Sequence, residues 1–393
     1  MAKYTAPREI ICGRECVEQL SCLRGKRAMV ITAGEKMEQR GFLSRALHAL
    51  RRTGMQTDHY KVEVEKEPEA RAQAGAAAMR AFLPDWIIAL GSESVTTAKL
   101  IWIFYEYPEA TLLDLRIPES IPLLRRKARF AAIPGLDQTV EAAAAAASLD
   151  GTAEQAAWTV YDTGLVPDMV FLDPEMLAAE PAESAAETAA AVFARAADAF
   201  SARDHQPFTS PQAAEAARLA LSYAKGAMNG EGEALFALQY AETLAGIAFS
   251  NVLHAPSAAF ARQIAGRFPC AEKRQGTLAL SFLPYVIRCF AANEEAAQRY
   301  TAFAATLGIK GKTQLQAALN LAKASERFFL ELGLPQTLQE MGIDADCFER
   351  DLDVIASRTA EDLYTDGGFR TLTQGEAKAV LQDIFRRKKI RIP

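Results

Sequence analysis

The sequence predicts an α/β domain built on a parallel sheet, followed by an all-α domain. In the first 180 residues, short apolar runs that suit buried strands alternate with segments of helical periodicity, as in parallel sheets. After Pro181 nearly every segment follows the 3.6-residue period of a helix. A length of 393 residues also favours two domains over one. We therefore place the domains at residues 1–180 and 181–393.

Each predicted element of the first domain is an apolar or β-branched run, or a helical pattern, between turn residues. The predicted strands are 10–12, 27–32, 55–62, 86–90, 131–134 and 166–175, the last ended by Pro174. The predicted helices are 42–53, 69–82 and one that runs through Lys99 and Trp102. In the second domain we predict helices at 185–201, 211–228, 233–251, 258–266, 277–291, 294–307, 312–332, 347–357 and 374–387.

The segment 85–102 combines a buried strand, a small-residue turn and a helix. Its turn, from Gly91 to Ser94, would aim backbone N–H groups and a helix N-terminus at a phosphate, which is typical of a dinucleotide-binding domain. Glu93 opposes this interpretation because a carboxylate in the turn repels an anion. Gly34 follows the predicted strand 27–32. For Gly34 and for Gly91, the alternative to contact with a ligand is a tight turn that needs no side chain.

Composition excludes several classes of protein. The formal net charge is −5, which gives no electrostatic reason to expect nucleic acid, and the basic run 386–391 is a short solvated end. No apolar run is long enough for a bilayer, and the N-terminus lacks the layout of a signal peptide. Six cysteines without a Cys-x-x-Cys pair indicate reduced thiols. We therefore expect a cytoplasmic protein.

Several local strings resemble the iron-containing (group III) alcohol dehydrogenase family, and the resemblance covers nearly the whole chain. The strings that carry it are residues 84–91, 98–109, 167–169, 173–175, 244–251 and 283–288. The resemblance implies a dehydroquinate synthase-like fold with the active cleft between the two domains. It also implies NAD(P)-dependent interconversion of alcohols and aldehydes, a divalent metal that polarises the oxygen, and a dimer.

The resemblance implies a metal held by one Asp and three His, but this chain departs from that set. The ligand positions fall on Ala191, Arg195, Ala258 and Gln275, and a further family histidine near the reaction centre falls on Arg262. Alanine has no donor atom and arginine stays protonated, so we predict no iron or zinc. Of the four histidines only His254 is near, one turn before Ala258, and we interpret it as a partly buried helix histidine or one that hydrogen-bonds a backbone carbonyl.

The family's cofactor turns are altered as well. The turn Gly-Gly-Gly-Ser-x-x-Asp is one residue shorter, at 91–96, and a second turn is reduced at 135–141. A lysine that usually contacts the cofactor aligns with Ala157. Gly34 stands where members that prefer NAD often hold an Asp, so any surviving preference leans to NADP. The candidate cofactor-binding residues are Gly34, Gly91, Ser92, Ser94 and Thr139. We expect Glu93, Asp137 and Glu141 to be solvated loop carboxylates.

Three functional hypotheses follow. The first is a non-catalytic family member that forms a homodimer or pairs with an active relative. The second is an NADP(H)-dependent alcohol or aldehyde oxidoreductase that works without metal, with Arg195 or Arg262 polarising the carbonyl. The third makes these two arginines a cationic hole for a small anion. Against the third stands the alternative that they pair with Asp198, Glu272 or another nearby acid.

Overall fold

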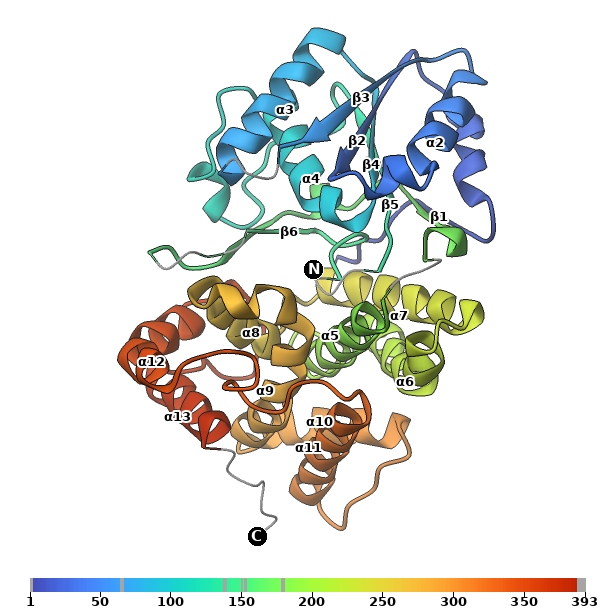
Figure 1. Ribbon diagram of the computed structural model, residues 1–393. Coiled ribbons are helices and arrows are strands. Elements are labelled where there is room, and N and C mark those ends of the chain that lie inside the picture. Colours follow the sequence, from blue (N-terminus) through green and yellow to red (C-terminus); the bar gives the residue numbers. More distant parts are fainter. Residues whose placement is uncertain are drawn as a thin grey trace.

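The protein has an α/β half and a helical half, stacked one above the other in the computed structural model (Figure 1). The structure describes residues 3–63, 67–136, 140–149, 151, 154–177 and 181–386. The chain crosses from the sheet to the helices between the last strand, which ends at Leu172, and the first long helix, which begins at Ala182.

A parallel sheet forms the core of the α/β half and confirms the predicted fold class. Its six described strands are ordered β1-β8-β5-β4-β2-β3, and each neighbouring pair is parallel. The strands are β1 (Glu9–Cys12), β2 (Arg27–Ala33), β3 (Gln56–Val62), β4 (Trp86–Leu90), β5 (Arg129–Ile133) and β8 (Met169–Leu172). Every residue of β4 is buried, as expected of a central strand covered on both faces.

Successive side chains of a strand point to opposite faces of the sheet, and helices pack against both faces. On β2, Ala28 and Val30 pack against α2 (Phe42–Arg51), while Met29 and Ile31 pack with α3 (Pro68–Phe82) and α4 (Ser92–Glu106). From β2 the chain leads to β3 on one side, whereas β4 pairs with the other side of β2. The strand order therefore reverses between β2 and β4, which is where open α/β sheets bind ligands.

The helical half is built around α5 (Ala182–Phe200), whose residues from Ala185 to Phe200 are all buried. Helices α6, α7, α8 and α9 surround it. The other described long helices are α6 (Thr209–Met228), α7 (Gly232–Ser250), α8 (Pro256–Arg267), α9 (Gln275–Phe290), α10 (Glu294–Thr306), α11 (Gln314–Glu331), α12 (Ala345–Ala360) and α13 (Gln374–Phe385). These agree with the predicted helices to within a few residues.

The short elements were not predicted. They include the 3₁₀ helix η1 (Cys16–Cys22), the helix α1 (Lys36–Gln39) and the antiparallel pair β6 (Ala146–Leu149) and β7 (Trp158–Tyr161). The last strand was predicted too long, because β8 covers only Met169–Leu172 and 3₁₀ turns lie on both sides of it.

A buried lysine fixes the alanine-rich segment that leads into β6. Lys99, on α4, donates from Nζ to the carbonyl oxygens of Glu141 (2.9 Å), Ala144 (2.6 Å) and Ala146 (2.8 Å). Alanine is the best helix former, yet this segment forms turns and a strand. The contacts from Lys99, together with the pairing of β6 with β7, therefore override the local helix propensity.

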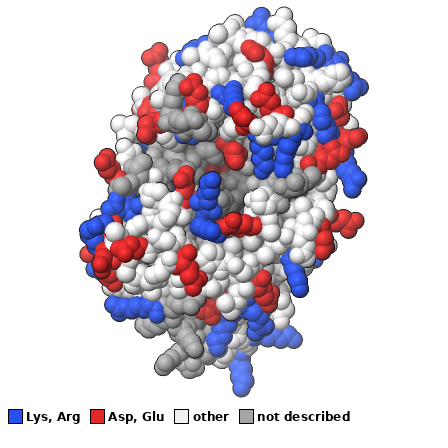
Figure 2. Space-filling model, viewed as in Figure 1, with Lys and Arg blue, Asp and Glu red and all other residues white. Residues whose placement is uncertain are grey.

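The surface carries both acidic and basic side chains, in agreement with the small formal net charge of −5. On the face shown in Figure 2, acidic and basic side chains are interspersed, and a hollow lies between the two halves. Within the described ranges, no helix combines the length and the apolar character that a bilayer crossing requires.

Candidate functional site

The loops after β2, β4 and β5 meet at the point where the strand order reverses. A pocket there is lined by residues of all three loops, among them Lys36, Gly91, Ser92, Glu93 and Gly135. Gly91 has φ 90°, and a Cβ on it would lie 3.1 Å from Met37 Cγ, so both its conformation and its surroundings favour glycine. Gly34, with φ 64°, follows β2 directly, next to Ala33, which lines the same pocket.

The two serines of this turn differ in role. Ser94 is fully buried and donates from Oγ to the carbonyl oxygen of Gly91 at 2.7 Å, so it holds the turn rather than facing a ligand. Ser92 Oγ is buried and has no hydrogen-bond partner among the described residues. The structure thus brings Gly34, Gly91 and Ser92 together. Thr139, the fifth predicted residue, lies outside the described residues, as does Asp137.

Glu93 reaches across this pocket. Its side chain is exposed, as predicted, and a Cβ placed on Gly34 would lie 3.8 Å from its Oε2 atom. Lys36 lines the same pocket and brings the opposite charge. The glycine turns, the unpartnered hydroxyl of Ser92 and the N-terminus of α4 fit a dinucleotide phosphate, whereas the carboxylate of Glu93 does not.

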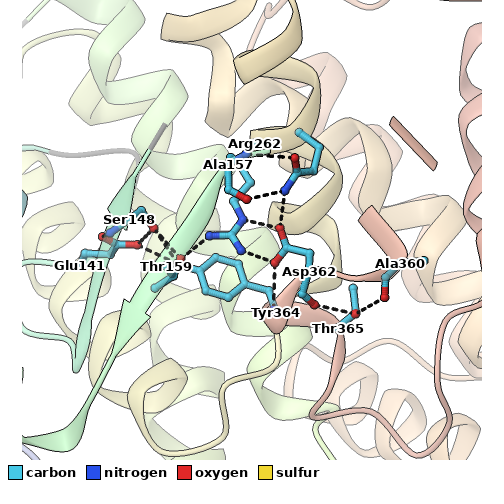
Figure 3. A network of polar contacts seen from close by, with 10 residues as sticks. Glu141, Ser148, Ala157, Thr159, Arg262, Ala360, Asp362, Tyr364 and Thr365 are labelled. Atoms are coloured by element: carbon cyan, nitrogen blue, oxygen red, sulfur yellow. Dashed lines mark hydrogen bonds and ion pairs between the residues drawn. The ribbon is translucent and has the colours of Figure 1, made fainter. Parts of the chain in front are cut away.

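The second candidate region lies where the resemblance implies a metal. Arg195, on α5, and Arg262, on α8, contact the ring of Tyr364, with guanidinium carbons 5.0 and 3.9 Å from the ring centroid. Tyr364 belongs to the 3₁₀ helix η6 (Leu363–Thr365). The three side chains are 6%, 5% and 1% exposed, respectively, so they form a buried cluster. Figure 3 shows Arg262, Asp362 and Tyr364 at its centre.

Asp362 neutralises Arg262. The guanidinium donates to both carboxylate oxygens of Asp362, from Nε at 2.6 Å and from a second nitrogen, and it also donates to Thr159 Oγ1. Burial by itself lowers the pKa of Arg262, but the Asp362 carboxylate outweighs it and the pKa lies above its ordinary value. For Arg262, the structure shows the predicted alternative in which the arginine pairs with an acid. The acid is neither Asp198 nor Glu272.

The hydroxyl of Tyr364 connects the cluster to the α/β half. It donates to Glu141 Oε1 at 2.9 Å and lies 2.8 Å from Ser148 Oγ. Burial raises the pKa of Tyr364, and the nearby Glu141 carboxylate adds to this, so the phenol keeps its proton. Glu141 itself is 1% exposed and accepts from Ser148 N at 2.8 Å. The prediction of a solvated Glu141 is therefore wrong, because the fold brings Tyr364 and Ser148 to its carboxylate.

The residues present do not fit a metal ion. Ala191 and Ala258 provide no donor atoms, and Arg195 and Arg262 bring positive charge to the site. Gln275, at the start of α9, offers only an amide. Nowhere in the described part of the chain do three or more His, Cys, Asp or Glu side chains gather closely enough to hold a metal.

His254 is a buried neutral histidine. It is 1% exposed, lies just before α8, and its ring meets Phe290 edge-on at 5.8 Å. Burial, with a smaller contribution from Arg203, lowers its pKa to about 3. This burial against an aromatic ring agrees with the structural role predicted as the alternative.

Asp198, another buried carboxylate, lies one turn after Arg195. Asp198 accepts from the backbone N–H of Ser257 at 2.8 Å and from its hydroxyl at 3.2 Å, near the start of α8. Burial raises the pKa of Asp198 to about 7, although the bonds from Ser257 and the charge of Arg195 act against this. Ala157, at the family's lysine position, makes backbone hydrogen bonds with the Gln263 side chain at 2.8 and 3.2 Å.

Two family models together match most of the chain. The model for iron-containing alcohol dehydrogenase matches residues 7–174, and that for the C-terminal part of the Fe-containing alcohol dehydrogenase family matches residues 185–385. The NADPH-dependent butanol dehydrogenase of Clostridium saccharobutylicum is 31% identical over 387 residues, which are 98% of each chain.

Solved structures give the same fold. The iron-containing alcohol dehydrogenase of Thermococcus thioreducens superposes with a TM-score of 0.85 at 24% identity, over 98% of this chain and 100% of the other. A 1,3-propanediol oxidoreductase superposes with a TM-score of 0.82 at 23% identity, with the same coverage.

Proposed function

The chain belongs to the iron-containing alcohol dehydrogenase family, and from that premise we propose that it binds NADP(H) but lacks metal-dependent alcohol dehydrogenase activity. The observation that carries the proposal is the cluster of Arg262, Asp362 and Tyr364. Arg195, which stands at a position where the resemblance implies a metal ligand, and Arg262, which is neutralised by Asp362, both contact the buried ring of Tyr364.

The pocket at the Gly91 turn supports nucleotide binding. It lies where the strand order reverses, and Ser92 offers an unpartnered hydroxyl to a phosphate. Two features favour NADP over NAD. Gly34 brings no carboxylate of its own against a 2′-phosphate, although Glu93 Oε2 lies nearby, and Glu35 is paired with Lys61 at 3.1 Å. The relative from Clostridium saccharobutylicum is named for its NADPH dependence.

The second candidate function is an NADP(H)-dependent alcohol or aldehyde oxidoreductase that works without metal. The 31% identity with a butanol dehydrogenase over 98% of the chain favours it. In this function a buried cation replaces the metal as the group that polarises the carbonyl oxygen. Asp362 already neutralises Arg262, which argues against Arg262 in this role. For the same reason we do not extend the proposal to an anionic ligand at Arg262.

One set of assays separates these functions. The purified protein is treated with EDTA, and butanal-dependent oxidation of NADPH is followed with and without added Fe²⁺ or Zn²⁺. Calorimetry measures the binding of NADPH and NADH to the same sample. Binding of NADPH without turnover supports the proposal, and turnover that EDTA leaves unchanged supports the metal-free oxidoreductase. Turnover that requires the metal overturns both.

A matched pair of variants locates the nucleotide. Lys36→Ala removes the cation of the Gly91 pocket and should weaken NADPH binding. Lys378→Ala removes a lysine of α13, in the other half, and should leave the binding unchanged.

We further propose that residues 1–180 and 181–393 are the two domains, that the protein is cytoplasmic, and that it forms a homodimer or pairs with an active relative. The mass of the purified protein by sedimentation tests self-association. Co-purification with a tagged, catalytically active family member tests the pairing.

A further inference from the structure

We propose that Tyr364 is an internal plug: its side chain fills a site for a phenol, built by both halves, beside Arg195, a position where the resemblance implies a metal ligand. The inference extends the proposed loss of metal chemistry and rests on it. It states what has taken the place of the metal, and why adding metal or substrate to the wild-type protein does not restore the site.

The ring of Tyr364 is held on several sides. The guanidinium carbons of Arg195 and Arg262 lie 5.0 and 3.9 Å from its centroid. Phe249, on α7, meets it edge-on at 4.9 Å and 78°. Cations over the face of an aromatic ring attract it through the ring quadrupole, and more strongly in a desolvated setting. The site therefore selects an aromatic ring rather than an aliphatic group of the same volume.

The polar end of the side chain is matched as well. The hydroxyl donates to Glu141 at 2.9 Å and lies 2.8 Å from the Ser148 hydroxyl. Both partners come from the α/β half, whereas Arg195 and Arg262 come from the helical half. A phenol satisfies every group of this site, whereas a phenyl ring leaves the carboxylate of Glu141 with one donor fewer.

The backbone around Tyr364 holds the plug in place. Its N–H donates to Asp362 Oδ1 at 3.0 Å, and its carbonyl oxygen accepts from Ala255 N at 2.8 Å. Asp362 is itself fixed by Arg262 and by Gln263 Nε2 at 2.7 Å. The residue that neutralises the arginine thus also positions the ring, and a metal ion would have to displace both.

Chemical complementation tests the inference. The variant Tyr364→Ala removes the plug, and p-cresol, which reproduces the tyrosine side chain, is offered to it at millimolar concentration. Near saturation the Tm of this variant should rise by about 2–4 °C, and toluene should raise it less. The wild-type protein should not respond, because its site is filled. Equal effects of p-cresol and toluene on the variant, or a response of the wild type, would overturn the proposal.

Phe130→Ala is the matched control. It also removes a fully buried ring, which stacks on Trp102 at 5.2 Å, but in apolar surroundings of the α/β half. There p-cresol should have no advantage over toluene. If Tyr364→Ala does not fold, it is refolded with each compound. Recovery of soluble protein with p-cresol but not with toluene supports the plug, and equal recovery or none overturns it.

These measurements need neither nucleotide nor metal. If the plug proposal is wrong, p-cresol and toluene have equal effects on Tyr364→Ala. If the proposed function is wrong, the wild-type protein shows metal-dependent turnover. The two results are therefore distinguishable.

Discussion

Removing one partner of the buried ion pair should destabilise the protein far more than removing both. The side chains of Arg262 and Asp362 are 5% and 0% exposed. Arg262→Met leaves the Asp362 carboxylate buried, with Gln263 and the Tyr364 N–H as its remaining donors. An uncompensated charge of this kind costs about 3–5 kcal/mol. In the double variant Arg262→Met/Asp362→Asn no charge is left, so it should be more stable than Arg262→Met.

Urea unfolding measures these effects as shifts of the midpoint at constant m. The control is Arg218→Met. Arg218 is paired with Glu215, but the two side chains are 53% and 45% exposed, and such pairs contribute about 0–1 kcal/mol. If Arg262→Met costs no more than Arg218→Met, or if the double variant is less stable than Arg262→Met, the argument from a buried, mutually neutralising pair is wrong.

Three further predictions concern buried groups with shifted pKa values and the Gly91 turn. The pKa of His254 falls from 6.5 in the unfolded chain to about 3 in the fold, so its contribution to stability is present above pH 6.5 and is lost as the pH falls. The shift corresponds to about 5 kcal/mol in full, and His254→Gln should reduce the loss of unfolding free energy between pH 7 and pH 5. The pKa of Asp198 rises from 3.8 to about 7, so between these values the folded state binds the proton and stability falls as the pH rises. Asp198→Asn should remove this fall of the unfolding free energy with pH, which has the opposite sign to the effect of His254, in the same titration. Gly91→Ala should cost about 1–3 kcal/mol, because alanine must adopt φ 90° with its Cβ 3.1 Å from Met37, and it should also weaken NADPH binding in calorimetry.

Each of these has a clear contrary result. A pH dependence that His254→Gln leaves unchanged would mean that folding does not lower the pKa of this histidine. The same slope in Asp198→Asn as in the wild type would place the acid-linked proton elsewhere. For the turn, Gly232→Ala is the control, since nothing lies within 4 Å of its Cβ position. Equal stability of Gly91→Ala and Gly232→Ala would refute the argument from strain.

Much of the fold could be predicted because it depends on local patterns. The run 86–90 is apolar throughout and forms a strand buried on both faces, and the predicted helices of the second domain recur with small shifts. The short elements were missed because tertiary contacts decide them. The segment from Glu141 to Ala147 holds six alanines, and it is not a helix because contacts from Lys99, from Ser250 and from the strand β7 hold its main chain.

The site could be predicted only in part. Arg195 and Arg262 were singled out by their places in the family pattern, and the structure brings them to one ring. Their partners could not be found in this way. Asp362 lies 100 residues after Arg262, and Tyr364 lies 223 residues after Glu141, so no local spacing links them. The charge balance of a buried site depends on topology, which the sequence pattern does not contain.

The three carbonyl contacts of Lys99 have a consequence for how this chain tolerates mutation. The lysine recognises main-chain oxygens of the segment 141–146, and every residue type supplies such an oxygen. Part of the shape of the segment is therefore encoded at position 99, some forty residues away, and part by the bonds of the Glu141 side chain to Ser148 and Tyr364. A substitution at Lys99 would remove three main-chain contacts of the segment at once, whichever side chains the segment carries.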